Sequence, residues 1–314
     1  MSSQYTVLLA TEKAFSATAV ESIASALPSP RFNLVKLEGY KTREQLLEAA
    51  ASADAAIVRS DKCDAEFFAH AKKLKVLVRA GAGVDTIDLE AATRNNVAVM
   101  NTPGQNSNAV AELAFGMMLS HIRSHYDGGM GTELRGKRLG LHGCGNVSKY
   151  MILLAKGFGM SVTAFDPFLT SDQIRAAGAE PADNLDKIFT SDFVSLHIPL
   201  TTETRASINK SLLSLMPANG VLVNTARQEV VNEDDLLTEL KERPEWGYLA
   251  DVVPANFEAI KEALGVSRFK KQVLVTPKKM GAQTAEANNN CAPAAARQIV
   301  AFFENGENKF QVNK

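Results

Sequence analysis

The chain has 314 residues, 46% hydrophobic and 22% charged, a composition that favours a globular protein of two domains. Its 34 basic residues nearly balance its 35 acidic residues, so no basic field favours nucleic acid or an anionic membrane. The three cysteines, Cys63, Cys144 and Cys291, are widely spaced. The sequence has no apolar run of about 18 residues and no signal-peptide pattern. We therefore expect a cytoplasmic protein without a metal site, whose partners are small molecules or other subunits.

Short apolar runs alternate with helical patterns along the chain. Over residues 1–101 the runs are YTVLL, FNLVKL, AAIVR, KVLVRAG and VAVMN, and over about 136–278 they are RLGLHG, SVTAFD, FVSLHI, GVLVNTA, YLADV and QVLVTP. Continuous apolar runs between helices predict parallel strands that are buried on both faces. The pattern therefore predicts two α/β units in tandem.

Two long helices are expected to link these units. Residues 107–124 are apolar enough for a buried helix between the units, and a second helix over about 284–305 ends at Gly306. If the second helix packs on the first unit, that unit is discontinuous in sequence. Pro293 lies inside it, and because proline removes a backbone donor we expect a kink near Ala292.

Residues 139–166, LGLHGCGNVSKYMILLAKGFGMSVTAFD, predict a strand, a glycine turn, a helix and a second strand that ends in an acid. Gly143 and Gly145 permit a tight turn that brings backbone close to a pyrophosphate at the helix N-terminus. Asp166 lies where a carboxylate accepts hydrogen bonds from an adenosine ribose and repels a 2′-phosphate, so the cofactor is expected to be NAD. Ser148 replaces the third glycine and is expected to displace the helix slightly. The alternative is an ordinary βαβ turn.

Parallel strands place their functional groups at their carboxyl ends. At the predicted ends lie Arg59-Ser60-Asp61-Lys62, Gly81-Ala82-Gly83, His197-Ile198-Pro199, Thr225-Ala226-Arg227, Asp251 and Lys278-Lys279.

These strand ends, together with MNTPGQNSNAVAE, GCGNVS, HIPLTTET and TPKKMGAQT, resemble the D-2-hydroxyacid dehydrogenases from about residue 55 onward. The likeness is greatest to the short, two-domain, lysine-type D-3-phosphoglycerate dehydrogenases. It implies two doubly wound parallel-sheet domains joined by two crossing helices. These are a flavodoxin-like substrate-binding domain (1–101 and 282–314) and a Rossmann-type NAD-binding domain (102–281), with closure expected about hinges near residues 101 and 282.

The resemblance implies a substrate site. Arg227 matches the arginine that binds the substrate carboxylate and carbonyl oxygen, a task that suits a planar and permanently charged guanidinium. Backbone amides of Ala82 and Gly83 would bind the other carboxylate oxygen, and Arg59 and Lys62, with Ser60 between them, would bind a phosphate. The alternatives are a surface arginine, a plain turn, and a solvated RSDK turn with internal ion pairs.

The family usually supplies its proton through a histidine held by a glutamate, and this chain lacks both. Lys279 stands at the histidine position, and Asn256 lies near the missing glutamate. A lysine pKa of about 10.4 would be lowered by burial beside Arg227, which suits an acid/base role. A substrate anchor or a solvated loop lysine is the alternative for Lys279, and Lys278 stands beside it as an extra residue.

The resemblance also implies the cofactor contacts. Asp251 resembles the aspartate that receives the nicotinamide amide, with a strand-end cap as the alternative. The expected cofactor-binding residues are Gly143, Gly145, Asn146, Val147, Asp166, Pro167, His197, Ile198, Pro199, Thr204, Thr225, Ala226, Asp251 and Gly281.

The expected function is NAD-dependent oxidation of D-3-phosphoglycerate to 3-phosphohydroxypyruvate, the entry to serine biosynthesis, by a homodimer that pairs through its NAD-binding domains. One alternative is a glyoxylate, hydroxypyruvate or other 2-keto acid reductase. A non-catalytic module that senses NAD is an alternative of another class.

Overall fold

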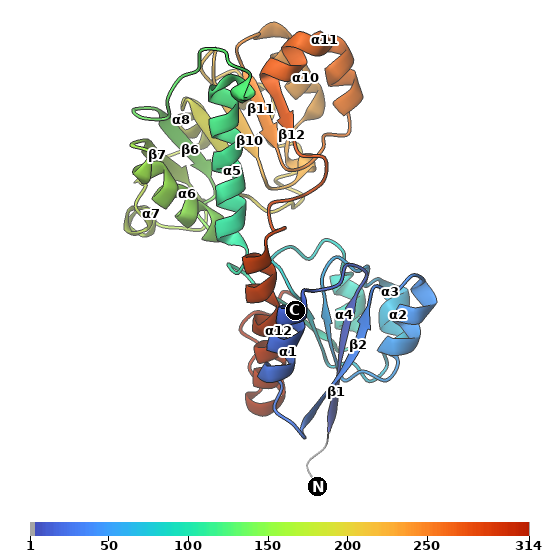
Figure 1. Cartoon of the computed structure of the whole chain (residues 1–314). Coiled ribbons are helices and arrows are strands. Elements are labelled where there is room, and N and C mark those ends of the chain that lie inside the picture. Colours follow the sequence, from blue (N-terminus) through green and yellow to red (C-terminus); the bar gives the residue numbers. More distant parts are fainter. Residues whose placement is uncertain (1–3, 314) are drawn as a thin grey trace. The chain divides into compact units, whose positions relative to one another are not determined.

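The computed structural model describes residues 4–313, which form two compact units (Figure 1). Among the described residues, unit 1 comprises 4–106 and 284–313, and unit 2 comprises Ser107–Gln283. Unit 1 therefore combines two stretches that are far apart in the sequence, whereas unit 2 is continuous. Each unit contains one parallel sheet, which confirms the α/β class predicted from the alternating runs.

Unit 1 has a five-stranded sheet in the order β2-β1-β3-β4-β5, the flavodoxin-like order. Every strand pair in it is parallel. Its elements are β1 (Tyr5–Thr11), α1 (Ala17–Ala26), β2 (Phe32–Glu38), α2 (Arg43–Ala50), β3 (Ala55–Val58), α3 (Ala65–His70), β4 (Val76–Arg79), α4 (Leu89–Arg94), β5 (Ala98–Asn101) and α12 (Ala285–Asn305).

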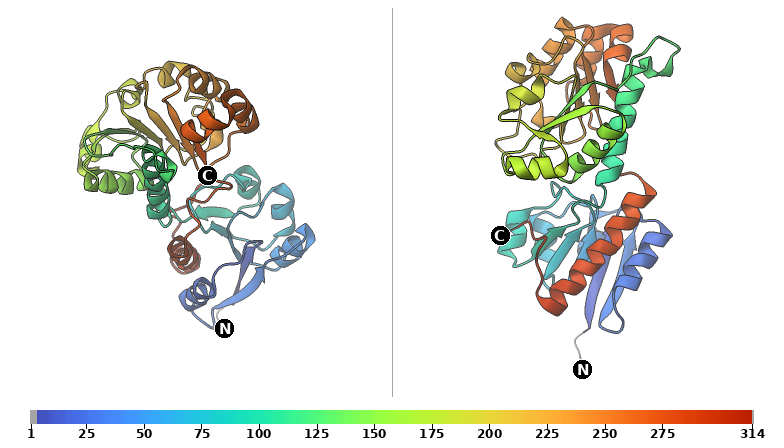
Figure 2. Two further views of the ribbon diagram at one scale, coloured as in Figure 1. Left: turned by 45° about the horizontal axis from the view of Figure 1, so that its top comes forward. Right: turned by 90° about the vertical axis from the view of Figure 1, so that its left-hand side faces the viewer.

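The strands of unit 1 are buried on both faces, as their continuous apolar sequences predict. Val7 and Leu9 of β1 point into a cluster that includes residues of α1 and α12, whereas Leu8 and Ala10 point into the opposite cluster with α2, α3 and α4. Successive side chains of a strand point to opposite faces, so a strand between two helix layers must be apolar throughout. Helices α1 and α12 lie side by side on one face (Figure 2).

Helix α12 packs on unit 1 and ends at Gly306, whose backbone is left-handed, both as expected. It is helical without a break through Pro293. The residues before and after the proline are anchored in the core, since Cys291, Ala292, Ala295 and Ala296 are all buried. This packing offsets the missing proline donor.

The segment after α12 covers the edge of the sheet at β5. Val312 N donates to Val99 O at 2.8 Å, and Val99 N donates to Asn313 Oδ1 at 2.7 Å. The Asn313 amide also donates to Val97 O at 2.9 Å. Because an uncovered edge strand exposes unpaired backbone groups, these contacts complete the sheet.

Unit 2 has a seven-stranded parallel sheet in the order β12-β11-β10-β9-β6-β7-β8, which is the Rossmann order with one further strand. Its elements are α5 (Ser107–Ile122), η1 (Ser124–Tyr126), β6 (Arg138–His142), α6 (Asn146–Gly157), β7 (Ser161–Phe165), α7 (Ser171–Ala177), β8 (Glu180–Pro181), α8 (Leu185–Phe189), β9 (Phe193–Leu196), α9 (Lys210–Leu213), β10 (Val221–Asn224), η2 (Gln228–Val230), α10 (Glu233–Glu242), β11 (Gly247–Ala250), α11 (Phe257–Gln272) and β12 (Val273–Val275).

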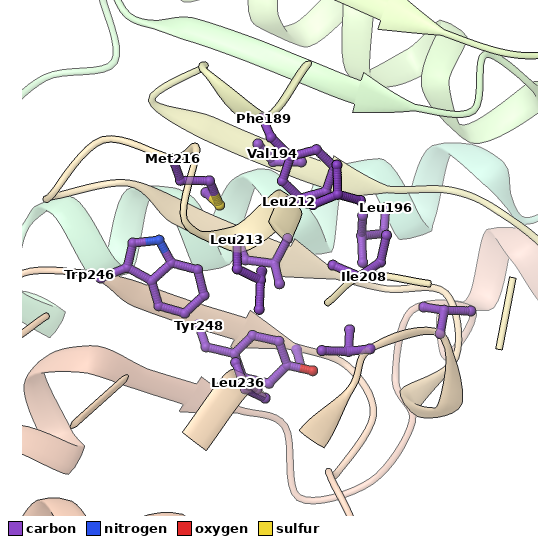
Figure 3. Packing of buried hydrophobic residues seen from close by; sticks show 14 of the residues in the cluster. Phe189, Val194, Leu196, Ile208, Leu212, Leu213, Met216, Leu236, Trp246 and Tyr248 are labelled. Carbon is purple, nitrogen blue, oxygen red and sulfur yellow. The ribbon is translucent and has the colours of Figure 1, made fainter. Parts of the chain in front are cut away.

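Two hydrophobic clusters hold the sheet of unit 2. One joins α5 and α6 to the sheet, and the other joins α8, α9 and α10 to its opposite face around Trp246 and Tyr248 (Figure 3). Both aromatic residues are at most 1% exposed. The strand order reverses between β6 and β9, and in such sheets ligands bind at the carboxyl ends of the strands beside this reversal.

Candidate functional site

The glycine turn between β6 and α6 has the form expected of a dinucleotide site. Gly143 has a φ of +91°, and a Cβ there would lie 2.7 Å from the carbonyl oxygen of His197. Gly145 is the N-cap of α6, and a Cβ there would meet no atom within 4 Å. The turn therefore requires glycine at 143, and it leaves the backbone open at the helix N-terminus, where a phosphate is favoured. Asn146 and Val147 form the first turn of α6.

Ser148 forms a bond that a glycine could not make. Its side chain is fully buried, and its Oγ donates to Gly143 O at 2.7 Å. The serine at the third glycine position thus ties α6 to the turn, where we had expected only a small displacement of the helix.

Asp166 follows β7 and is oriented by the backbone. Its Oδ2 accepts from Cys144 N at 2.9 Å, and its Oδ1 accepts from Phe168 N at 2.9 Å. A carboxylate has about four acceptor positions, so both oxygens can still accept from ribose hydroxyls. Pro167 is exposed beside it. These residues fit the adenosine ribose of NAD.

Two buried histidines flank the glycine turn. Burial lowers the pKa of His142 to about 4, although Asp166 opposes the shift. Burial, and then the proximity of His142, lower the pKa of His197 to about 3. His197 N donates to His142 O at 2.9 Å, and the His197 ring nitrogen Nε2 lies 3.0 Å from Ser195 Oγ. Both imidazoles are therefore neutral near pH 7 and bring no charge to the turn.

The segment after β9 forms a folded loop. Ile198 is buried and Pro199 is exposed. Thr204 Oγ1 donates to Pro199 O at 2.7 Å and accepts from Thr201 N at 2.8 Å. Thr204 thus fixes the loop at the carboxyl end of β9, beside the reversal of strand order.

Asn224 holds the turn that carries Arg227. Its side chain accepts from Ala226 N at 3.0 Å and donates to Arg227 O at 2.9 Å. Thr225 and Ala226 are buried, whereas Arg227 is half-buried. Arg227 Nη1 donates to Ala226 O at 2.8 Å.

Lys279 meets Arg227 at this same turn. Lys279 Nζ donates to Ala226 O at 3.4 Å, so the two cationic groups share one acceptor and lie within about 6 Å of each other. Lys279 and Lys278 are both exposed, and unit 2 therefore does not supply the burial on which we based a lowered pKa for Lys279. The structure brings the two expected catalytic residues together.

Asn256 contacts Glu233, the first residue of α10. Its backbone N donates to Glu233 Oε2 at 3.0 Å, and its side chain donates to Glu233 O at 2.8 Å. At the position where the family glutamate is expected to be missing, Asn256 therefore contacts Glu233 at the start of α10.

Arg59 lies at the end of β3, at the reversal of strand order in unit 1. Its guanidinium donates to Lys13 O at 3.1 Å and to Asn288 Oδ1 at 2.6 Å, and lies 4.8 Å from the centre of the Phe15 ring. Burial lowers the pKa of Arg59. These contacts fix the head of Arg59 at the edge where a ligand of unit 1 is expected.

Lys62 and Ser60 are exposed, and Lys62 has a different partner from Arg59. The Lys62 side chain is 76% exposed, and its Nζ forms an ion pair with Asp64 at 3.2 Å. The internal ion pair of the RSDK turn, which we had weighed as the alternative, is therefore present at Lys62.

Arg79, which is not among the residues expected from the sequence, also lies at this site. Its Nε donates to Arg59 O at 2.9 Å, and its guanidinium lies where a side chain on Gly81 would have to be. The sequence contains a signal for Arg79, because an arginine ends the otherwise apolar strand VLVR at the carboxyl end of the sheet. Ala82, which is exposed, and Gly83, which is half-buried, follow in this loop, and Asn101 Nδ2 donates to Ala82 O at 2.6 Å.

Within residues 4–313, no three or more His, Cys, Asp or Glu side chains come together in a way that could hold a metal ion. No helix among these residues combines the length and hydropathy that a membrane span requires.

Comparisons with known proteins identify the family of this chain. Residues 111–278 match the family model described as D-isomer specific 2-hydroxyacid dehydrogenase, NAD binding domain. The D-3-phosphoglycerate dehydrogenase of Methanocaldococcus jannaschii is 35% identical over 273 residues, which cover 82% of this chain and 51% of that protein. The chain thus spans about half the length of this relative.

Two further proteins are similar to this chain over a larger share of their own length. The glyoxylate reductase of Thermococcus litoralis is 33% identical over 281 residues, 83% of each chain. The crystal structure of NAD⁺-bound 3-phosphoglycerate dehydrogenase from Entamoeba histolytica superposes with a TM-score of 0.90 at 40% identity and covers 99% of both chains.

Proposed function

The chain belongs to the NAD-dependent D-2-hydroxyacid dehydrogenases, and on this premise we propose that it oxidises D-3-phosphoglycerate to 3-phosphohydroxypyruvate. The proposal draws on the match to the Entamoeba protein over nearly the whole length of both chains. The observation that carries the chemistry is the meeting of Arg227 and Lys279 at the carbonyl of Ala226.

NAD, when bound, accepts the hydride that leaves C2 of the hydroxy acid. In our proposal, Lys279 Nζ takes the proton of the C2 hydroxyl in the same reaction, and the C2–O bond becomes a carbonyl. Lys279 can take this proton only when its own side chain is neutral. A guanidinium within about 6 Å disfavours the charged form of the lysine and so favours the neutral form. Arg227 binds the carboxylate and the oxygen on C2.

We propose that Arg59 binds the phosphate of the substrate and that Arg79 assists it. The fixed head of Arg59 and the adjacent guanidinium of Arg79 provide positive charge for a phosphate dianion. Lys62 contributes less in this proposal, because it already pairs with Asp64. Ser60 and the amides of Ala82 and Gly83 complete the proposed substrate contacts.

A reductase of glyoxylate or hydroxypyruvate is the second candidate. It is favoured by the similarity to the Thermococcus enzyme over most of both chains and by the ion pair that engages Lys62. Such a substrate has no phosphate and would not need Arg59.

We further propose a cytoplasmic homodimer that pairs through unit 2. The segment after α5 exposes large apolar side chains, with Met130 99% and Tyr126 69% exposed. Exposed apolar surface of this kind marks protein interfaces. The three buried cysteines are free thiols, as a reducing compartment requires.

The catalytic assignment is tested by NADH oxidation with phosphohydroxypyruvate, on the wild type and on Lys279→Ala. A general base contributes roughly 100-fold to 10,000-fold, so kcat should fall by at least about 100-fold while NADH fluorescence titration gives an unchanged Kd. Lys278→Ala, which removes the neighbouring exposed lysine, is the matched control. A wild type that binds NADH but reduces no 2-keto acid would support the non-catalytic module.

The phosphate assignment is tested by Arg59→Ala combined with Lys62→Ala. We expect kcat/KM for phosphohydroxypyruvate to fall by about 100-fold, since charged hydrogen bonds are lost, with little change for hydroxypyruvate and glyoxylate. An equal effect on all three keto acids would contradict phosphate binding, and a wild type that prefers glyoxylate would favour the reductase.

A further inference from the structure

The loop that carries Lys279 is held by one buried carboxylate. Asp251 follows β11 and is 1% exposed. Its Oδ1 accepts from Met280 N at 2.6 Å, and its Oδ2 accepts from Gly281 N at 2.7 Å. The hydroxyl of Thr276 lies 2.9 Å from Oδ1 and 2.9 Å from Lys278 O, and its single proton can go to one of them at a time.

These contacts enclose Lys279 on both sides. Thr276 precedes the lysine, Met280 and Gly281 follow it, and the loop between them contains no helix or strand. A buried carboxylate is costly unless it is hydrogen-bonded, so contacts to Asp251 hold the loop strongly. A Cβ on Gly281 would lie 2.8 Å from Asp251 Oδ2, which explains why glycine stands there.

The carboxyl end of the neighbouring strand β10 fixes the turn that carries Arg227. Asn224 ends β10, which pairs with β11, and Asp251 N donates to Asn224 O at 3.0 Å. The Asn224 side chain holds the turn of Ala226 and Arg227, as described above. Neighbouring strand ends therefore hold one turn each, and the two turns meet where Lys279 Nζ contacts Ala226 O.

We propose that Asp251 is a positioning residue that fixes Lys279 relative to Arg227. This role rests on the proposed function of Lys279, and it adds to the contact with the nicotinamide amide that the family resemblance implies for Asp251. Both carboxylate oxygens are used by the Lys279 loop, and a carboxylate so engaged holds a defined orientation.

Asp251→Asn tests the proposal, because an amide has one acceptor oxygen and must present its NH₂ to a backbone N–H. In the protein without ligands, we expect the Met280 and Gly281 amides to exchange hydrogen about 10-fold faster or more, as measured by NMR. The kcat for phosphohydroxypyruvate, measured at saturating NADH, should fall by at least about 10-fold.

A cofactor analogue separates the two roles. In reduced 3-acetylpyridine adenine dinucleotide an acetyl group replaces the carboxamide, so a residue that binds the carboxamide discriminates between it and NADH. With the analogue, which lacks the amide group, the loss of kcat in Asp251→Asn arises from positioning alone, and we expect a loss of at least about 10-fold to persist. A loss of kcat with NADH only, together with unchanged amide exchange, would overturn the proposal and leave Asp251 as a cofactor contact alone.

Two more variants complete the experiment. Thr276→Val removes one contact of Asp251 and should raise the exchange of the same amides by a smaller factor, even if Asp251→Asn fails to fold. Asp192→Asn, at the amino end of the central strand β9, alters an aspartate that accepts from Arg138 N at 2.7 Å and should leave the loop unchanged. Amide exchange requires no substrate, so it tests the positioning even if the assignment of Lys279 fails.

Discussion

His142 links the glycine turn to the pH dependence of stability. Its side chain is 6% exposed, and burial lowers its pKa from 6.5 to about 4. Between these values the unfolded chain binds a proton that the folded protein does not, so the free energy of unfolding falls as the pH falls from 6.5 to about 4. Above pH 6.5 this loss is absent. The shift corresponds to about 3 kcal/mol.

We expect His142→Gln to reduce this loss of stability in acid. The variant should lose less unfolding free energy than the wild type between pH 7.5 and pH 5, as measured by urea unfolding. Trp246, the single tryptophan and fully buried in unit 2, provides the fluorescence signal. His70→Gln, at an exposed position, is the control. Identical acid profiles for His142→Gln and the wild type would contradict this account.

Ser148 predicts a second residue effect. Ser148→Ala leaves Gly143 O without the 2.7 Å hydrogen bond in a buried site, so the free energy of unfolding should fall by about 1 to 3 kcal/mol. The same Trp246 signal measures the change. Ser214→Ala removes an exposed contact of 3.3 Å and should cost less than about 0.5 kcal/mol. Equal effects of the two substitutions would show that the Ser148 bond is not important.

Single residues were the least predictable level of the site. The positions of Gly143, Gly145 and Asp166 follow from the strand–turn–helix pattern, because local backbone geometry requires them. The bond of Ser148, the ion pair of Lys62 and the contact of Arg79 with Arg59 depend on side-chain directions, which spacing in a sequence does not define. The meeting of Lys279 and Arg227 was expected only through the family resemblance.

At the scale of elements, two exposed glycines have opposite roles. Gly265 interrupts α11 with φ 66° and ψ 166°, whereas Gly116 lies inside α5 without a positive φ, and neither has an atom within 4 Å of its Cβ position. Gly265→Ala should lower the unfolding free energy by about 1 to 3 kcal/mol through backbone strain alone. Gly116→Ala should raise it by about 0.5 to 1 kcal/mol.

Urea unfolding followed by Trp246 measures both changes in unit 2, and each variant serves as the control of the other. If both alanines change stability in the same direction, the backbone angles do not determine the difference.

Elements with a strong local pattern were predicted correctly, and the exceptions have physical reasons. The apolar strand runs and both long helices are found, because burial on two faces leaves a clear pattern. Strand β8 was missed, since its two residues, Glu180 and Pro181, lie at the sheet edge and carry no apolar run. At Pro293 the local rule for proline predicts a kink or a break, and α12 continues through the proline without a break.

At the scale of the whole molecule, the proposed homodimer predicts a change of mass. Met130→Glu places a charge on the most exposed of the large apolar residues, and we expect it to weaken the dimer. Light scattering after gel filtration, at several protein concentrations, should shift from dimer toward monomer. Phe168→Glu, which changes an 88% exposed phenylalanine elsewhere on unit 2, is the matched control. A wild type that is monomeric at every concentration would contradict the dimer.

Two sheets of parallel strands could be predicted for the whole chain, because a βα repeat that restarts near residue 136 leaves few other arrangements. The substrate could not be predicted to the same degree. The choice of substrate depends on which cationic side chains contact the substituent on C3 of the substrate. A change of one ion pair, such as that of Lys62 with Asp64, alters these contacts without altering the fold.

The discontinuous course of unit 1 sets an order for folding during synthesis. When residues 107–283 have left the ribosome, unit 2 has every strand it needs, whereas unit 1 still lacks α12 and the segment 311–313 that covers β5. Until then the apolar face of its nascent sheet and the edge at β5 are uncovered, which makes this half of the chain the one that a chaperone would bind. Unit 2 therefore completes its fold before unit 1, although most of unit 1 is translated earlier.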